Sequence, residues 1–204
     1  MLDVDSLSIG VVVALVVVVV TFLVQRLNGV QMWNARLTYA LGEGNREEVL
    51  SLLEQTPLDA TLDGGDHKGQ KLIHLATVLG DVDIIAKLLQ RPPKALISVH
   101  SVVEETGNTP LHLAALHGRR QVVQSLLDHG AEVNSRNREG WTPLHIASMK
   151  GRHQVKEVLL AARADPALLT RSGMSSFELQ EREKVHYSET RGWMAPEPTR
   201  TNST

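Results

Sequence analysis

The stretch "GNTPLHLAALHG", Gly107 to Gly118, decides the fold, because it returns in closely similar form as "GWTPLHIASMKG", Gly140 to Gly151. Both copies place Thr-Pro-Leu-His two residues after a glycine, and both end on a second glycine. A weaker copy, "GQKLIHLATVLG", spans Gly69 to Gly80. A segment that recurs along one chain indicates stacked structural units, none of which buries its apolar face alone.

The spacing of the copies defines a period in the low thirties. Gly140 lies 33 residues after Gly107 and Gly173 another 33 later, whereas Gly69 precedes Gly107 by 38. An earlier copy keeps the same framework of apolar and small residues. It comprises Leu37, Ala40, Gly44, Val49, Leu52 and Leu53. We therefore expect about four helix–turn–helix units and a partial unit that caps the C-terminal end, over residues 30–180.

Each unit is expected to contain two short helices. Thr109 can cap the first helix, and Pro110 suits its opening turn, where the missing N–H costs nothing. Gly118 suits the left-handed residue that ends the helix. Residues 122–130 predict the second helix, and the polar residues 131–140 predict an extended loop into the next unit.

His74, His112 and His145 occupy the same place in three successive units. A histidine in this setting can be a base, a metal ligand or a structural residue. Packed helices lie about 8–10 Å apart, so these imidazoles cannot share a metal ion with bonds near 2 Å. No Ser, Asp or Glu recurs beside all three, as a catalytic triad requires. We therefore predict a structural role.

The two best copies, residues 108–134 and 140–166, closely resemble the ankyrin repeat, and the resemblance extends over about residues 33–180. It implies an all-α solenoid in which the repeated histidine bonds to backbone between units. The residues that carry this structural pattern are Thr109, Pro110, His74, His112, Gly118, Thr142, Pro143, His145 and Gly151.

The same resemblance implies a surface that binds other proteins, because family members mostly use loop tips and the exposed side of the first helices. The matching residues here are Leu79, Asn108, Leu116, His117, Arg138, Trp141, Met149 and Lys150. We expect Leu116 and Met149 to be exposed beside Trp141. In the C-terminal tail, Trp193 is a further candidate anchor.

Two equivalent turns carry Arg119-Arg120 and Arg152-His153, which form a short basic stripe. This stripe is either solvated surface or a site for an anionic partner. The insertion Arg91 to Glu105 contains the apolar run Ala95 to Val103. That run either folds onto the stack or presents an apolar surface to a neighbouring subunit.

Some units depart from the pattern at positions that matter for capping. Lys71-Leu72 replaces Thr-Pro, and Arg163 stands where the preceding repeat has Gly130. In the last unit Phe177 stands at the leucine position and Glu178 replaces the histidine. We interpret these changes as capping changes that make an outer face polar.

The segment "LSIGVVVALVVVVVTFLV", Leu7 to Val24, carries no charge and is long enough, at about 27 Å as a helix, to cross a bilayer. A cleaved signal peptide is the main alternative. The residues before it contain Asp3 and Asp5 and no basic residue, the reverse of a secretory signal. We therefore predict a short N-terminal tail over residues 1–6 and a transmembrane helix over residues 7–26.

The flanks of this segment predict its orientation. Arg26, Arg36 and Arg46 lie on its C-terminal side, so the N-terminus is expected outside and the repeats on the cytosolic or a matrix-like side. The pattern does not distinguish an endomembrane from a mitochondrial membrane. Residues 181–204 are charged and then Pro- and Thr-rich, which predicts a polar tail.

The composition narrows the class of function. The net charge is −2, which predicts no nucleic-acid partner, and the absence of Cys excludes Cys-based zinc sites. No phosphate loop, paired carboxylates or nucleophile motif is present, so we expect neither an enzyme nor a bound cofactor or metal.

We favour a membrane-anchored scaffold that serves as an accessory subunit of a larger membrane complex, such as an organellar energy-converting or transport complex. The alternative is an adaptor that recruits a soluble client to a membrane.

Overall fold

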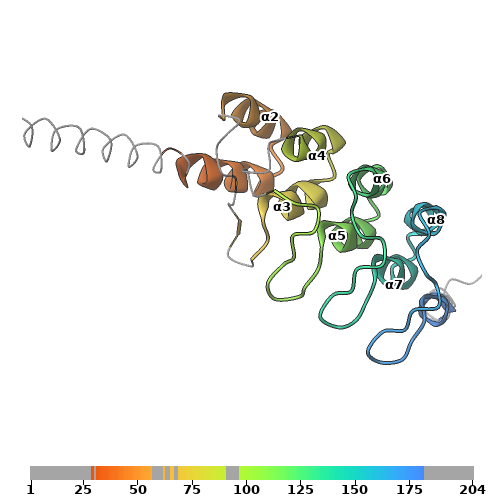
Figure 1. Cartoon of the computed structure of the whole chain (residues 1–204). Helices are drawn as coiled ribbons and strands as arrows, with labels where there is room; N and C mark the ends of the chain where they lie inside the picture. Colours follow the sequence, from red (N-terminus) through yellow and green to blue (C-terminus); the bar gives the residue numbers. More distant parts are fainter. Residues whose placement is uncertain are drawn as a thin grey trace, which may run out of the picture. The chain divides into compact units, whose positions relative to one another are not determined.

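The computed structural model describes residues 29, 31–56, 62, 65–66, 69–90 and 97–181. The chain divides into two compact units, unit 1 ending at Ser101 and unit 2 starting at Val102, and each is described by itself. Both consist of short helices joined by turns and loops (Figure 1). Within the described residues, the only β feature is a single bridge between Gly65 and Lys71. The expected all-α class is confirmed for this part of the chain.

Unit 1 contains a helix over residues 31–42, then α2 (Arg46–Gln55), α3 (Leu72–Leu79) and α4 (Val82–Leu89). Helix α4 packs against both α2 and α3. Aliphatic side chains that are at most 5% exposed form the core, in keeping with the low aromatic content. They include Leu37, Leu41, Val49, Leu52, Ile73, Ile84, Ile85 and Leu88.

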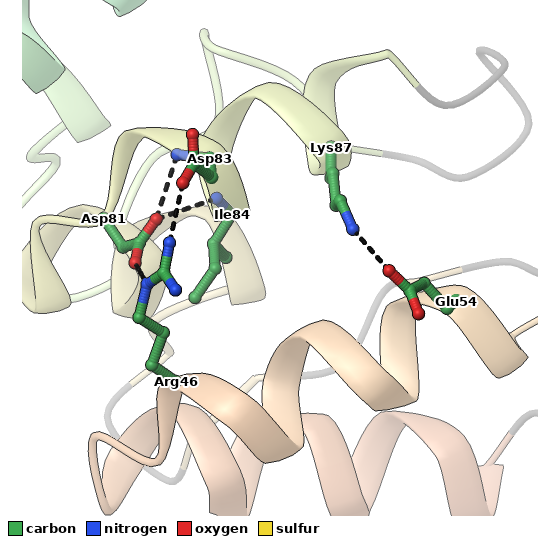
Figure 2. Close-up of polar contacts among 6 residues, drawn as sticks. All are labelled: Arg46, Glu54, Asp81, Asp83, Ile84 and Lys87. Atoms are coloured by element: carbon green, nitrogen blue, oxygen red, sulfur yellow. Dashed lines mark hydrogen bonds and ion pairs between the residues drawn. The ribbon is translucent and has the colours of Figure 1, made fainter.

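Ion pairs join α2 to α4 (Figure 2). Arg46, the first residue of α2, pairs with Asp81, and its Nη2 lies 2.6 Å from Oδ2 of Asp83. At the other end, Nζ of Lys87 lies 2.8 Å from Oε1 of Glu54. The side chains of Arg46, Asp83, Lys87 and Glu54 are each more than 40% exposed, so water screens the pairs, and the buried aliphatic core contributes more to stability.

Unit 2 contains α5 (Pro110–His117), α6 (Arg120–Asp128), α7 (Pro143–Met149), α8 (His153–Ala161) and a last helical turn over residues 176–181. First helices pack on first helices (α5 on α7) and second helices on second helices (α6 on α8). The fully buried side chains include Leu111, Ala114, Val123, Leu126, Leu144, Ala147, Val155 and Leu159. The buried alanines are small enough to let neighbouring helices approach closely.

Local sequence explains where these helices begin. Thr109 and Thr142 are the N-cap residues of α5 and α7, and Pro110 and Pro143 are the first helical residues. The side chain of Thr142 accepts from the N–H of His145, whereas neither Thr109 nor Lys71, which holds the same position before α3, makes a side-chain cap bond of this kind. The missing threonine therefore does not prevent α3 from starting at the position that the repeat predicts.

The last unit differs from the polar outer face that we expected. Phe177 is 65% exposed, although its counterpart Leu111 is fully buried. Helix α5 packs against both α6 and α7, whereas no helix follows residues 176–181 within the described part of the chain. Arg163 has a positive φ of 65°, a left-handed conformation that its counterpart Gly130 adopts more easily.

The insertion lies partly within the described residues, from residue 97 onward. Val99 and Val103 are buried, and Val102 is 48% exposed. The backbone N–H of Val103 donates to the carbonyl of Asn108, so this end of the insertion turns back toward the start of α5. These contacts favour the interpretation that its apolar residues fold onto the repeats. Residues 91–96 lie outside the described part.

Several predictions concern segments outside the described residues. They include the tail over residues 1–6, the transmembrane segment Leu7 to Val24, Trp193 and the C-terminal tail after residue 181. None of the described helices has the length and apolar character that a bilayer crossing needs.

Candidate functional site

The three repeated histidines are fully buried, and each accepts a hydrogen bond at Nδ1. The donors are the backbone N–H groups of the residues three positions earlier, Lys71, Thr109 and Thr142, at 3.0, 3.1 and 3.0 Å. The hydroxyls of the two threonines lie 2.8 and 2.7 Å from the same nitrogens and must also donate, because these nitrogens carry no proton.

The other ring nitrogen, Nε2, lies close to a carbonyl oxygen of the following loop. The distances are 3.1 Å from His74 to Ser101, 2.9 Å from His112 to Trp141 and 2.8 Å from His145 to Leu168. A carbonyl oxygen only accepts, so Nε2 carries the proton and the ring is neutral. Each histidine therefore ties the start of its own helix to the next loop along the chain.

Burial shifts the pKa of His112 and that of His145 in the same direction. It lowers the pKa of His112 to about 4, against the opposing hydrogen bond to Trp141. Burial also lowers the pKa of His145. A general base works best with a pKa near the operating pH and with access to substrate. His112 has neither property, so its chemistry is that of a structural hydrogen-bonding group.

A side chain that the sequence analysis missed joins two of the candidate residues. Asn137 donates from Nδ2 to Oδ1 of Asn108 at 2.9 Å and accepts at Oδ1 from the N–H of Trp141 at 2.9 Å. Asp66 and Thr170 accept from the N–H four residues later in the same way. The signal was present in the sequence as a polar residue three positions before each of Gly69, Gly140 and Gly173.

The candidate partner-binding residues differ in exposure. His117, Arg138 and Lys150 are exposed, and Asn108 and Trp141 are half-buried. Leu79, Leu116 and Met149 are also half-buried, although we expected the last two to be exposed. Each of these three lies at or next to the C-terminal end of a first helix. The structure therefore offers a mainly polar surface there.

The turns that follow Leu116 and Met149 form a recess. His117 and Gly118 line it from the α5–α6 turn, and Gly151, Arg152 and His153 line it from the α7–α8 turn. Gly118 and Gly151 both have positive φ, of 68° and 61°. Burial, and then the charges of Arg119 and Arg152, lower the pKa of His117. The positive charges of both arginines therefore act on the histidine that lines the recess.

The described ranges contain no group of three or more His, Cys, Asp or Glu side chains arranged to hold a metal ion. Because their rings are enclosed and both nitrogens are bonded, the repeated histidines act as links between repeats. The residues that remain available to a partner are the exposed ones on the loops and turns.

Comparison with known proteins agrees with this geometry. Residues 93–169 match the family described as ankyrin repeats (3 copies). This chain contains ankyrin repeats. This match confirms the resemblance over residues 93–169, which lie within the range of about residues 33–180 that the sequence motifs indicated. Ankyrin repeats stack into extended surfaces that bind other proteins.

Three relatives illustrate the range of proteins that share these repeats. The chain is 32% identical to human Ankyrin repeat domain-containing protein 13C over 99 residues, which are 48% of this chain and 17% of that protein. It is 33% identical to pig (Sus scrofa) NF-kappa-B inhibitor alpha over 95 residues, 45% and 29% of the two chains. It is 32% identical to rat (Rattus norvegicus) diacylglycerol kinase zeta over 75 residues, which are 37% of this chain and 8% of that protein.

The chain spans less than a third of the length of each of these relatives. A match to 8% of a kinase carries no kinase activity over to this chain. What the relatives share with it is the repeat, and with the repeat a means of binding proteins.

Proposed function

We propose that this ankyrin-repeat protein is a membrane-anchored scaffold that binds other proteins as an accessory subunit of a larger membrane complex. The observation that supports the binding role is that the repeated histidines are buried inside the repeats. His74, His112 and His145 are fully buried with both ring nitrogens bonded, so the polar groups that define the repeat serve the fold. The exposed loops and turns are then the part of the repeats that can contact a partner.

The membrane anchor is proposed from sequence. Leu7 to Val24 is uncharged over 18 residues, and Arg26 and Arg36 follow it. By the positive-inside rule, the N-terminus lies outside and the repeats lie on the cytosolic or matrix-like side of an endomembrane or mitochondrial membrane. Met32 and Tyr39, 65% and 68% exposed on the helix over residues 31–42, suit a position near the lipid surface.

Alkaline carbonate extraction of membranes tests the anchor. We expect the full chain to stay in the membrane pellet and the double variant Val17→Lys, Val18→Lys to be extracted, because two charges at the centre of the segment oppose insertion. The matched control Val17→Leu, Val18→Leu keeps the segment apolar and is expected to stay in the pellet. Extraction of the unaltered chain would contradict membrane anchoring.

Native-gel migration after mild detergent extraction, with mass spectrometry of the co-migrating proteins, tests the subunit role. We expect one discrete large band with fixed companions. A monomer would contradict the proposal. A small band with scattered, salt-sensitive companions would instead indicate the adaptor alternative, which recruits a soluble client. In that case alanine substitutions at Leu116, Trp141 and Met149 would test the client surface.

A further inference from the structure

The recess between the α5–α6 turn and the α7–α8 turn has a volume of about 390 Å³. It lies within unit 2, between the turns of two successive repeats. The Nε of Arg152 donates to the carbonyl of Leu116 across it at 3.3 Å, and a methyl group on Gly118 would come within 3.0 Å of Cδ of Arg152. The arginine is therefore held in a defined position at the recess.

The two turns that form the recess carry cations and no acidic residue. Residues 116–120 read Leu-His-Gly-Arg-Arg, and residues 149–153 read Met-Lys-Gly-Arg-His. In unit 1 the corresponding turns carry both signs of charge, and Arg46 is paired with Asp81 and Asp83 (Figure 2). The recess of unit 2 thus has the same repeat geometry without the acids that neutralise the arginine in unit 1.

We propose that this recess binds a carboxylate side chain from an acidic segment of a protein partner. The inference rests on the proposed protein-binding function and specifies the chemistry of the partner. An arginine fork matches a carboxylate with two parallel hydrogen bonds. The other side-chain donors that line the recess are the rings of His117 and His153 and the amide of Gln154. Helix α8 also begins here without a side-chain cap, so its first N–H groups add favourable potential for an anion.

The shape and charge of the site favour a protein over nucleic acid or a lipid surface. The net charge of the chain is −2, so no long-range attraction draws it to a polyanion. A nucleic acid needs a track of cations along many phosphates, and these cations are confined to two turns. A recess of this volume accepts a side chain, whereas a flat headgroup layer contacts only its rim.

Fluorescence anisotropy with the full chain in non-ionic detergent tests this proposal. The probe is a fluorescein-labelled Gly-Glu-Glu-Glu-Glu-Gly peptide, and the same peptide with Gln in place of Glu is the reference. We expect the Glu peptide to bind and the Gln peptide not to bind. Arg152→Gln is expected to weaken binding at least tenfold. Arg136→Gln removes the same charge from an exposed position in the loop between α6 and α7, and it is expected to change the Kd less than twofold.

Several outcomes would overturn the inference. Equal losses from Arg152→Gln and Arg136→Gln would show a response to net charge only, and equal binding of both peptides would show that carboxylates are not recognised. If DNA or phosphatidylserine vesicles bound in an Arg152-dependent way and the peptide did not, the partner would be a nucleic acid or a membrane and not a protein. If native gels still show fixed protein companions in any of these cases, the scaffold function stands and only this recess is misassigned. Urea unfolding of each variant checks that its fold is unchanged.

Discussion

The Nε2 of His112 donates to the carbonyl oxygen of Trp141, 2.9 Å away and 29 residues later in the chain. The same ring accepts at Nδ1 from the N–H of Thr109, so one buried side chain joins the start of α5 to the start of the next repeat. Replacing it therefore leaves a donor and an acceptor unsatisfied on two different segments.

His112→Ala is expected to lower the free energy of unfolding by about 3 kcal/mol, because it removes a fully buried ring and orphans its two partners. His117→Ala removes an exposed histidine five residues later and is expected to change stability by less than about 0.5 kcal/mol. Urea denaturation of both variants measures the difference. Similar values for the two would contradict the structural role of His112.

Stability is expected to fall as the pH drops below about 6.5. The folded-state pKa of His112 is lowered from 6.5 to about 4, so the unfolded chain binds a proton more readily between these values. The stabilisation is fully present above pH 6.5 and is lost as the pH falls toward 4. Between pH 7 and pH 5 the loss is on the order of 2 kcal/mol.

Urea unfolding at pH 7 and pH 5 checks this sign and size. In His112→Gln the pH dependence is expected to shrink, leaving a smaller slope of the same sign from His145, whose pKa is also lowered. An unchanged slope in that variant would show that other groups cause the acid sensitivity.

Asp81 caps α4 and also pairs with Arg46. Its Oδ1 accepts from the N–H groups of Asp83 and Ile84 at 2.9 and 3.1 Å. We expect Asp81→Ala to lower stability by about 1 kcal/mol through loss of the cap. Asp81→Asn keeps a cap oxygen and loses only the screened ion pair, so thermal unfolding should show a smaller loss. Equal losses would mean that the ion pair outweighs the cap.

Among the residues that the structure describes, Arg163 is the one non-glycine residue with a positive φ, and its side chain is exposed. We expect Arg163→Gly to raise stability by about 0.5–1 kcal/mol, because glycine adopts this conformation without strain. Arg136→Gly is the matched control, since Arg136 is exposed in the preceding loop without a positive φ, and it is expected to give no gain. A loss of stability in Arg163→Gly would show that the arginine side chain contributes contacts that outweigh the strain.

Leu111 and Phe177 occupy equivalent positions in the repeat, yet they are 0% and 65% exposed. Leu111→Ala is expected to cost about 3 kcal/mol through the lost burial and the cavity. Phe177→Ala is expected to change stability by less than about 0.5 kcal/mol. Denaturant unfolding of the full chain distinguishes them. A large loss in Phe177→Ala would show that Phe177 is covered in solution.

Much of the fold follows from the sequence because its signals are local. The Thr-Pro helix starts at Thr109 and Thr142 and the spacing of buried Leu and Ala residues act within one or two helical turns. The period of 33 repeats these local signals along the chain. The structural role of the repeated histidines was predicted from the exclusion of a shared metal ion and of a triad, and their bonds to backbone were implied by the family resemblance.

The tertiary structure alone decided what depends on residues distant in the chain. The acceptors of the histidines, the pairing of Arg46 with Asp81, the partial burial of Leu116 and Met149, and the recess at Arg152 each need two repeats side by side. Phe177 makes the same point, because its position in the repeat predicts burial while its exposure depends on what packs against it. Helix starts are properties of a short segment and the period is read directly from the sequence, whereas burial and long-range pairing are properties of the stack.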